Sequence, residues 1–223
     1  DDEHGKELWS SDGTAEGTQV LRDFLPGPDG QSFMTVTVFQ GRAVFSAEEP
    51  EHGRELWATD DTPAGTSLFL DLTPGPESTS AYSFIVAGQK MFFISDSGGN
   101  VYDSRLWVTD GTLNGTRRIH AADGSDFDYP GGSIRAVDGK LYFAGHTHLG
   151  GTEPWVSDGT DAGTHMIANL GEDGAPSSFP RLFAGTTNLL FFHATEGTLA
   201  DSAGVGEILP WITQFPLALG SLL

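Results

Sequence analysis

A twelve-residue phrase returns four times along the chain at nearly constant spacing. Each copy contains a tryptophan, and the intervals between successive tryptophans are 48, 50 and 48 residues. The spacing Trp-x-x-Asp-x-Thr-x-x-Gly-Thr is shared by all four copies, whose tryptophans are Trp9, Trp57, Trp107 and Trp155. A repeat of this period indicates one supersecondary unit copied several times, so it constrains the architecture much more strongly than the chemistry.

Each unit also contains four short segments typical of strands. The second segment is a continuous apolar run in every unit, which predicts a strand buried on both faces. These runs are Ala43–Phe45, Met91–Ile94, Leu141–Ala144 and Leu189–Phe192. A turn with a glycine precedes each run, at Gly41, Gly88, Gly139 and Gly185. The tryptophan lies on the third segment, and the fourth follows the Asp-x-Thr turn.

Four antiparallel strands per unit predict an all-β fold, a β-propeller of four-stranded blades. We expect residues 1–194 to form the repeats and residues 195–223 to be a divergent C-terminal segment. The ring would have four blades if the two ends of the chain share one. The alternative is a part of a larger propeller. The four tryptophans are expected to occupy equivalent buried positions between blades.

The charge balance narrows the class of partner. The chain has 31 acidic and 11 basic residues, a formal net charge of −20, and no cysteine. Such an acidic surface repels phosphate, so we expect no nucleic acid partner. No apolar run approaches the roughly 18 residues needed to span a membrane. The apolar stretch Phe215–Leu223 is expected to dock on its own propeller or in a homodimer, because it would otherwise be a sticky edge.

The repeated phrase resembles the ELWxxDGT repeat family. Its first copy reads Glu7-Leu8-Trp9-x-x-Asp12-Gly13-Thr14, and the four copies cover about residues 4 to 194. Departures from the family pattern are Asp61 for glycine, Arg105 for glutamate and Pro154 for leucine. The resemblance implies an extracellular or cell-surface bacterial protein with a propeller fold. It implies no reaction, because the motif has none established for it.

The repeated aspartates have two interpretations. A carboxylate in a glycine-rich turn is a common calcium ligand, but the alternating ladder of a calcium loop is missing here. Asp followed by Gly is also what a tight turn requires, because Asp bonds its own backbone and Gly adopts a positive φ. The second interpretation, a structural turn, is favoured for Asp12, Asp60, Asp110 and Asp158.

Residues that interrupt the repeat are better candidates for binding, because the fold does not require them. Two acidic loops are candidate calcium sites, and a His-x-His pair at the end of an apolar run is a candidate transition-metal site. The residues concerned are Asp96, Asp103, Asp123, Asp126, Asp128, His146 and His148. Calcium is therefore the one cofactor that the sequence suggests, and solvated loops are the alternative.

No catalytic motif is present in the sequence. There is no Gly-x-Ser-x-Gly, no His-Glu-x-x-His and no phosphate-binding glycine loop. We therefore expect a secreted or surface-exposed binding or adhesion module that recognises a carbohydrate or protein ligand through loops on one propeller face. The alternative is an extracellular hydrolase with carboxylates, or His146 and His148, around a central pocket. Exposed aromatic residues in a groove would favour binding, and converging ionisable groups would favour catalysis.

Overall fold

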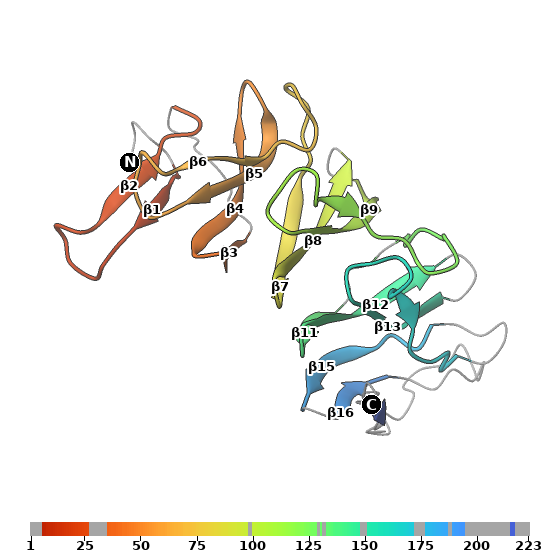
Figure 1. Ribbon diagram of the computed structural model, residues 1–223. Coiled ribbons are helices and arrows are strands. Elements are labelled where there is room, and N and C mark those ends of the chain that lie inside the picture. The colour runs from red at the N-terminus through yellow and green to blue at the C-terminus, as the bar shows by residue number, and fades with distance from the viewer. Residues whose placement is uncertain are drawn as a thin grey trace, which may run out of the picture. The chain divides into compact units, whose positions relative to one another are not determined.

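The structure is a computed structural model that describes residues 6–26, 35–97, 100–128, 130, 133–147, 151–171, 177–186, 189–194 and 215–216. Within these residues the regular elements are strands (Figure 1). In chain order they are β1 (Leu8–Ser10), β2 (Gln19–Arg22), β3 (Val36–Phe39), β4 (Arg42–Glu49), β5 (Gly53–Thr59), β6 (Ser67–Leu70), β7 (Ala81–Ala87), β8 (Lys90–Ser97), β9 (Asn100–Thr109), β10 (Arg117–Arg118), β11 (Ile134–Val137), β12 (Lys140–Thr147), β13 (Gly151–Ser157), β14 (His165–Met166), β15 (Arg181–Gly185), β16 (Leu189–His193) and β17 (Phe215–Pro216). The all-β prediction is confirmed.

The strands form antiparallel sheets that follow the repeat. Three sheets have four strands each, in the orders β3-β4-β5-β6, β7-β8-β9-β10 and β11-β12-β13-β14. The first hairpin forms a two-stranded sheet, β1-β2, and the last strands form the sheet β15-β16-β17. The sheets are therefore the four-stranded units that the repeat predicts. Of the described residues, none belongs to a helix that could cross a lipid bilayer.

The chain divides into two compact units. Unit 1 contains residues 1–101 with 107–117, and unit 2 contains residues 102–106 with 118–223. The sheets β1-β2 and β3–β6 belong to unit 1, and the sheets β11–β14 and β15–β17 belong to unit 2. Each unit has its own apolar core, described separately below.

The cores consist of the apolar second strands and the residues that face them. In unit 1, Val44 is fully buried in a cluster that includes Phe39, Leu56, Phe84 and Met91. In unit 2, Tyr142 and Val156 pack with Phe183, Leu190 and Phe192. Consecutive residues of β4, β8 and β12 are buried, so both faces of these strands are covered, which explains their continuous apolar runs. On β16 buried and half-buried residues alternate, so burial on both faces is not confirmed for the run Leu189–Phe192.

The glycine turns before the second strands are also as expected. Asp138 and Gly139 both have positive φ, 48° and 72°. Two consecutive residues with positive φ are characteristic of the type I′ turn, which matches the twist of a two-residue hairpin. Lys140 pairs with Val137 directly after the turn, so this geometry sets the register of β11 and β12.

The prediction for the four tryptophans is right for two and wrong for one. Trp57 and Trp155 are 2% and 5% exposed. Trp107 is half-buried and stacks on Phe93. Trp9 is 53% exposed, which contradicts the expectation. The reason is local, since Trp57 lies opposite Phe45 on β4, whereas β2 is the strand partner that the described residues provide for β1.

The C-terminal expectations are tested only in part. Residues 195–214 and 217–223 lie outside the described residues. Phe215 and Pro216 pair with Leu190 and Leu189 of β16. The proposed domain boundary at residue 194 stays a prediction.

Candidate functional site

The repeated Asp-x-Thr-x-x-Gly-Thr segment forms one hydrogen-bonded turn in all four copies. In the third copy, Asp110 Oδ1 accepts from the backbone N–H of Thr112 at 2.9 Å and from its hydroxyl at 2.7 Å. Thr112 Oγ1 in turn accepts from Gly115 N at 3.0 Å, and Thr116 Oγ1 donates to Thr112 O at 2.5 Å. The same four bonds recur in the other copies.

The second glycine of the motif is required by the position of the aspartate. A Cβ placed on Gly115 would overlap the Asp110 carboxylate, and the same overlap arises at Gly17, Gly65 and Gly163. Since Oδ1 already accepts two hydrogen bonds and the glycine packs against the carboxylate, the geometry explains every fixed residue of the motif. No cation is needed to account for it, which supports the structural interpretation of the repeated aspartates.

These hydrogen bonds lower the pKa of the turn carboxylates. The side chains of Thr14, Thr62 and Thr112 are the largest cause for Asp12, Asp60 and Asp110, because a hydroxyl that donates to the charged form favours it. A lowered folded-state pKa contributes stability that is present above the ordinary aspartate pKa of 3.8 and is lost as the pH falls through the folded-state pKa. We expect Thr14→Val to raise the pKa of Asp12, measured by NMR titration of the side-chain carboxyl. An unchanged pKa would show that the hydroxyl is not its main determinant.

Asp61 follows the motif aspartate in the second copy, whereas the other three copies have a glycine at this position. Its φ is 78°, close to the 92° of Gly13 and the 94° of Gly111. This left-handed conformation carries a cost for a residue with a Cβ, which Asp tolerates better than most. We therefore expect Asp61→Gly to raise the free energy of unfolding by about 0.5–1 kcal/mol in urea denaturation. Gly13→Asp, where a Cβ meets open space, is the matched reverse variant, and it should be destabilising.

The glutamate that precedes the Leu-Trp or Pro-Trp pair in three of the four copies has a structural role that the sequence did not reveal. Glu55 is fully buried, and its two oxygens accept from the backbone N–H groups of Leu72 and Thr73 at 3.1 and 3.2 Å. Glu153 accepts from Leu170 N at 3.1 Å, and Glu7 from Phe24 N at 3.3 Å. The separation is 17 residues in all three copies, so each glutamate holds the loop that follows its own fourth strand.

Burial raises the pKa of Glu55, and the negative charge of Asp71 adds to this effect, while the backbone bonds oppose it. A buried carboxyl with a raised pKa is often a catalytic acid. Here the hydrogen bonds to Leu72 and Thr73 give it a structural use instead. Arg105 replaces the glutamate in the third copy, and its guanidinium donates to Ser104 O at 3.0 Å.

The candidate calcium residues near Asp123 are engaged with protein groups. Asp123 Oδ1 accepts from the N–H and the hydroxyl of Ser125, at 2.9 and 2.7 Å, and the latter bond lowers its pKa. Asp126 lies 3.4 Å from both Arg118 and His120. Asp128 N donates to His146 O at 2.9 Å, which joins this loop to β12. Asp128 and His146 were predicted to belong to separate sites, but the two residues are adjacent in the fold.

The remaining candidates are more scattered. Asp96 is almost buried on β8, and Asp103 lies on β9. His146 is half-buried on β12, and His148 lies outside the described residues. Within the part of the chain that the structure describes, no three His, Asp or Glu residues are grouped so as to hold a metal ion. Calcium and transition-metal binding stay predictions.

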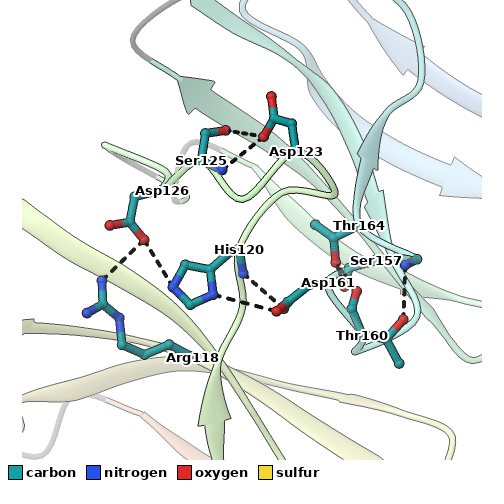
Figure 2. Close-up of polar contacts among 10 residues, drawn as sticks. Arg118, His120, Asp123, Ser125, Asp126, Ser157, Thr160, Asp161 and Thr164 are labelled. Atoms are coloured by element: carbon teal, nitrogen blue, oxygen red, sulfur yellow. Dashed lines mark hydrogen bonds and ion pairs between the residues drawn. The ribbon is translucent and has the colours of Figure 1, made fainter.

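A histidine between two carboxylates is the main polar cluster of unit 2 (Figure 2). Figure 2 shows His120 with Asp126 on one side and Asp161 on the other. Nε2 lies 3.4 Å from Asp126, Nδ1 lies 3.7 Å from Asp161, and the backbone N–H of His120 donates to Asp161 at 3.2 Å. All three side chains are a third to a half exposed. Salt screens such exposed pairs, so the cluster orders a loop and contributes little to the free energy of unfolding.

Unit 1 contains a similar arrangement around His52. Nδ1 lies 3.1 Å from Asp71 and Nε2 lies 3.6 Å from Glu49. Glu49 also pairs with Arg22, whose guanidinium lies 4.4 Å from the centre of the Trp57 ring. No local motif indicated this cluster, because its members come from β4, the turn before β5 and the loop after β6. Neither cluster has the nucleophile that a hydrolytic triad needs.

An apolar groove in unit 1 is a candidate binding site. Its volume is about 400 Å³, within the usual range for ligand pockets. Its lining residues come from the β1–β2 hairpin, from β3 and β4, and from the turn after β5: Leu8, Trp9, Ser10, Ser11, Leu21, Val36, Val38, Gly41, Ala43, Thr59, Asp60 and Asp61. Trp9, Val36 and Val38 are also large exposed apolar residues, at 53%, 48% and 69%. The groove is thus a shallow site with an exposed aromatic ring.

No protein-family model matches the chain, and no curated protein sequence matches it. Among solved structures, it is similar to TolB from Acinetobacter baumannii, with 11% identity and a TM-score of 0.37 over 87% of this chain and 58% of TolB. It is also similar to a candidate exo-beta-1,3-galactanase from Bifidobacterium bifidum s17, with 13% identity and a TM-score of 0.34 over 72% and 60% of the two chains. The chain spans about three-fifths of each of these structures. Likeness at these TM-scores carries no information on activity.

Proposed function

We propose that the chain is a β-propeller-type binding module, secreted or exposed on a bacterial cell surface, that takes a protein ligand in the groove of unit 1. The repeat and the four-stranded sheets support the propeller architecture. The resemblance to the ELWxxDGT family supports the location. The groove supports a protein as the ligand, because the equivalent surface in the next repeat is covered by protein.

The carrying observation is that the same surface is covered elsewhere in unit 1. Val36 and Ala43 lie nine and two residues before Phe45. Phe84 and Met91 lie nine and two residues before Phe93, so they occupy the equivalent positions of the next repeat. Phe84 and Met91 are 5% and 0% exposed, and they share a cluster with Phe39 and Val44 of the β3–β4 hairpin. In the groove the matching Val36 is 48% exposed. The covering surface at the buried copy includes the apolar side chains of the β3–β4 hairpin together with Leu56, Ala58 and Leu70 of β5 and β6.

A hairpin is therefore the ligand that the walls of the groove fit best. Burial of exposed valine and tryptophan surface favours an apolar protein segment, at about 25 cal/mol per Å². Strand addition to a sheet edge is also a common way to bind a peptide. A sugar would stack on Trp9, but the valines would gain little from its hydroxyls. The hydrolase alternative has less support. Among the described groove residues, Asp60 is the one with a shifted pKa, and the shift is explained by the hydrogen bond from Thr62 in its own turn.

The test is a binding titration with a cyclised peptide of residues 36–49, the hairpin that covers the buried copy of the surface. Cyclisation is needed because an isolated hairpin is only marginally stable. We expect binding by calorimetry, and we expect Val38→Asp in the protein to weaken it at least about tenfold, the equivalent of 1.4 kcal/mol. Val38 is 69% exposed, so this variant should fold normally.

Neutral oligosaccharides and a panel of hydrolase substrates are the parallel arms. Sugar binding that is lost in Trp9→Ala, with no peptide binding, would replace the protein ligand by a carbohydrate. Turnover lost in His146→Ala would favour the hydrolase.

A further inference from the structure

One rim of the groove departs from the repeat at a single residue, Asp61. The corresponding residue in the next repeat is Gly111, directly after the motif aspartate Asp110. Asp61 lines the groove, is exposed, and has a φ of 78°, which glycine adopts at lower cost. Among the described residues, none forms a hydrogen bond or an ion pair with its carboxylate. This side chain therefore costs stability without making a structural contact, a combination that is common at functional sites.

The covered copy of the surface shows what approaches this position. There the turn of the β3–β4 hairpin contributes Gln40, whose Nε2 donates to Asp110 O at 2.8 Å. Its Oε1 lies 2.8 Å from the place that a Cβ on Gly111 would occupy. The glutamine thus occupies the space that Gly111 leaves open by having no side chain. All three residues belong to unit 1, so the contact lies within one compact unit.

The same contact would not form unchanged in the groove. A hairpin that lay on the groove as β3–β4 lies on the next repeat would bring its turn residue to Asp60 and Asp61. The Oε1 atom of a glutamine would then meet the Asp61 side chain, and an amide oxygen and a carboxylate are both acceptors. A basic side chain has donors only. A lysine ammonium has three, enough for both the carbonyl of Asp60 and the carboxylate of Asp61.

The carboxylate of Asp60 is less suited to a ligand. Its Oδ1 already accepts from the N–H and the hydroxyl of Thr62, at 3.1 and 2.7 Å. Asp60 is therefore part of its own turn, as in the other copies of the motif. Asp61 is the carboxylate that the groove has in addition to the repeat.

On the basis of the proposed function, we propose that the protein ligand of the groove is a β-hairpin with a lysine or arginine in its turn, at the place that Gln40 occupies in the covered copy. Its apolar strand residues would cover Trp9, Val36 and Val38, and its basic side chain would pair with Asp61. The formal net charge of −20 suits such a partner, because an acidic surface attracts a cationic segment and speeds its association.

The test compares two cyclised peptides of residues 36–49, one with the native Gln40 and one with Gln40→Lys, by calorimetry against the full chain at low ionic strength. We expect the Gln40→Lys peptide to bind about three- to fivefold more tightly, the size typical of one exposed charge pair. In about 1 M sodium chloride, where the Debye length is about 3 Å, this preference should largely disappear.

Asp61→Asn separates the charge of Asp61 from its size. Asparagine has nearly the same volume and tolerates a positive φ, so this chain should fold like the parent and bind the two peptides equally. Glu51→Gln is the matched control, because it also removes one negative charge, at an exposed position in the turn between β4 and β5, outside the groove. It should keep the preference for lysine.

Equal binding of the two peptides to the parent chain would overturn the basic turn residue and leave a hairpin as the ligand. A lysine preference that persists in Asp61→Asn, or that is lost in Glu51→Gln, would also overturn it, because the preference would then not come from Asp61. If neither peptide binds, the basic turn residue and the proposed function are both contradicted.

Discussion

Replacing Trp57 by alanine is expected to lower the free energy of unfolding by about 3–5 kcal/mol, the usual cost of truncating a buried aromatic residue. Trp57 is 2% exposed and packs edge-on against Phe24, with ring centroids 4.9 Å apart, in a cluster that includes Phe45. The guanidinium of Arg22 also lies over the Trp57 ring, 4.4 Å from its centre. Truncation would leave a cavity and remove both contacts, which come from β2 and the loop that follows it.

The matched control for this experiment is Trp9→Ala at the first copy of the same motif. Trp9 is 53% exposed, so its truncation should cost less than about 1 kcal/mol in dilute urea denaturation, like other surface substitutions. Equal losses for the two variants would show that the two positions are equally buried in solution. A Trp57→Ala chain as stable as the parent would contradict the packing of the unit 1 core.

Removal of the buried carboxylate in Glu55→Ala is expected to cost about 2–4 kcal/mol, because each buried N–H left without an acceptor costs roughly 1–3 kcal/mol. The two donors are the backbone N–H groups of Leu72 and Thr73. Glu51→Ala is the matched control, since Glu51 is exposed in the turn between β4 and β5. If Glu55→Ala and Glu51→Ala unfold at the same urea concentration, Glu55 does not hold the loop.

The pH dependence of Glu55 has a definite sign. Burial raises its folded-state pKa above the ordinary glutamate pKa of 4.5, so the folded protein holds this proton more tightly than the unfolded chain does. Its contribution to stability is complete below pH 4.5 and declines as the pH rises through the folded pKa. The stability of the parent relative to Glu55→Gln should therefore fall on going from pH 4.5 upward, by urea denaturation at several pH values. A relative stability that rises with pH would contradict the direction of the shift.

The groove and the polar clusters could not be predicted from the sequence. Trp9 is exposed because β2 is the strand partner that the described residues provide for β1, although Trp9 follows the same Glu-Leu pair as the buried Trp57. His120 meets Asp161 across 41 residues, and Glu55 meets Leu72 across 17. Such partners are set by which loops the sheets bring together. A local sequence pattern does not indicate which loops come together.

Within the turns, the sequence alone determined almost everything. The interpretation of Asp110 as a turn residue agrees with its bonds to Thr112, and the requirement for Gly115 follows from the Asp110 carboxylate beside it. The buried second strands follow equally from their continuous apolar composition, as at Met91. These features depend on residues within a few positions of one another, whose contacts backbone geometry fixes. The tertiary structure decided which glutamates and histidines are engaged and which tryptophan is left exposed, because those outcomes depend on contacts between segments far apart in the chain.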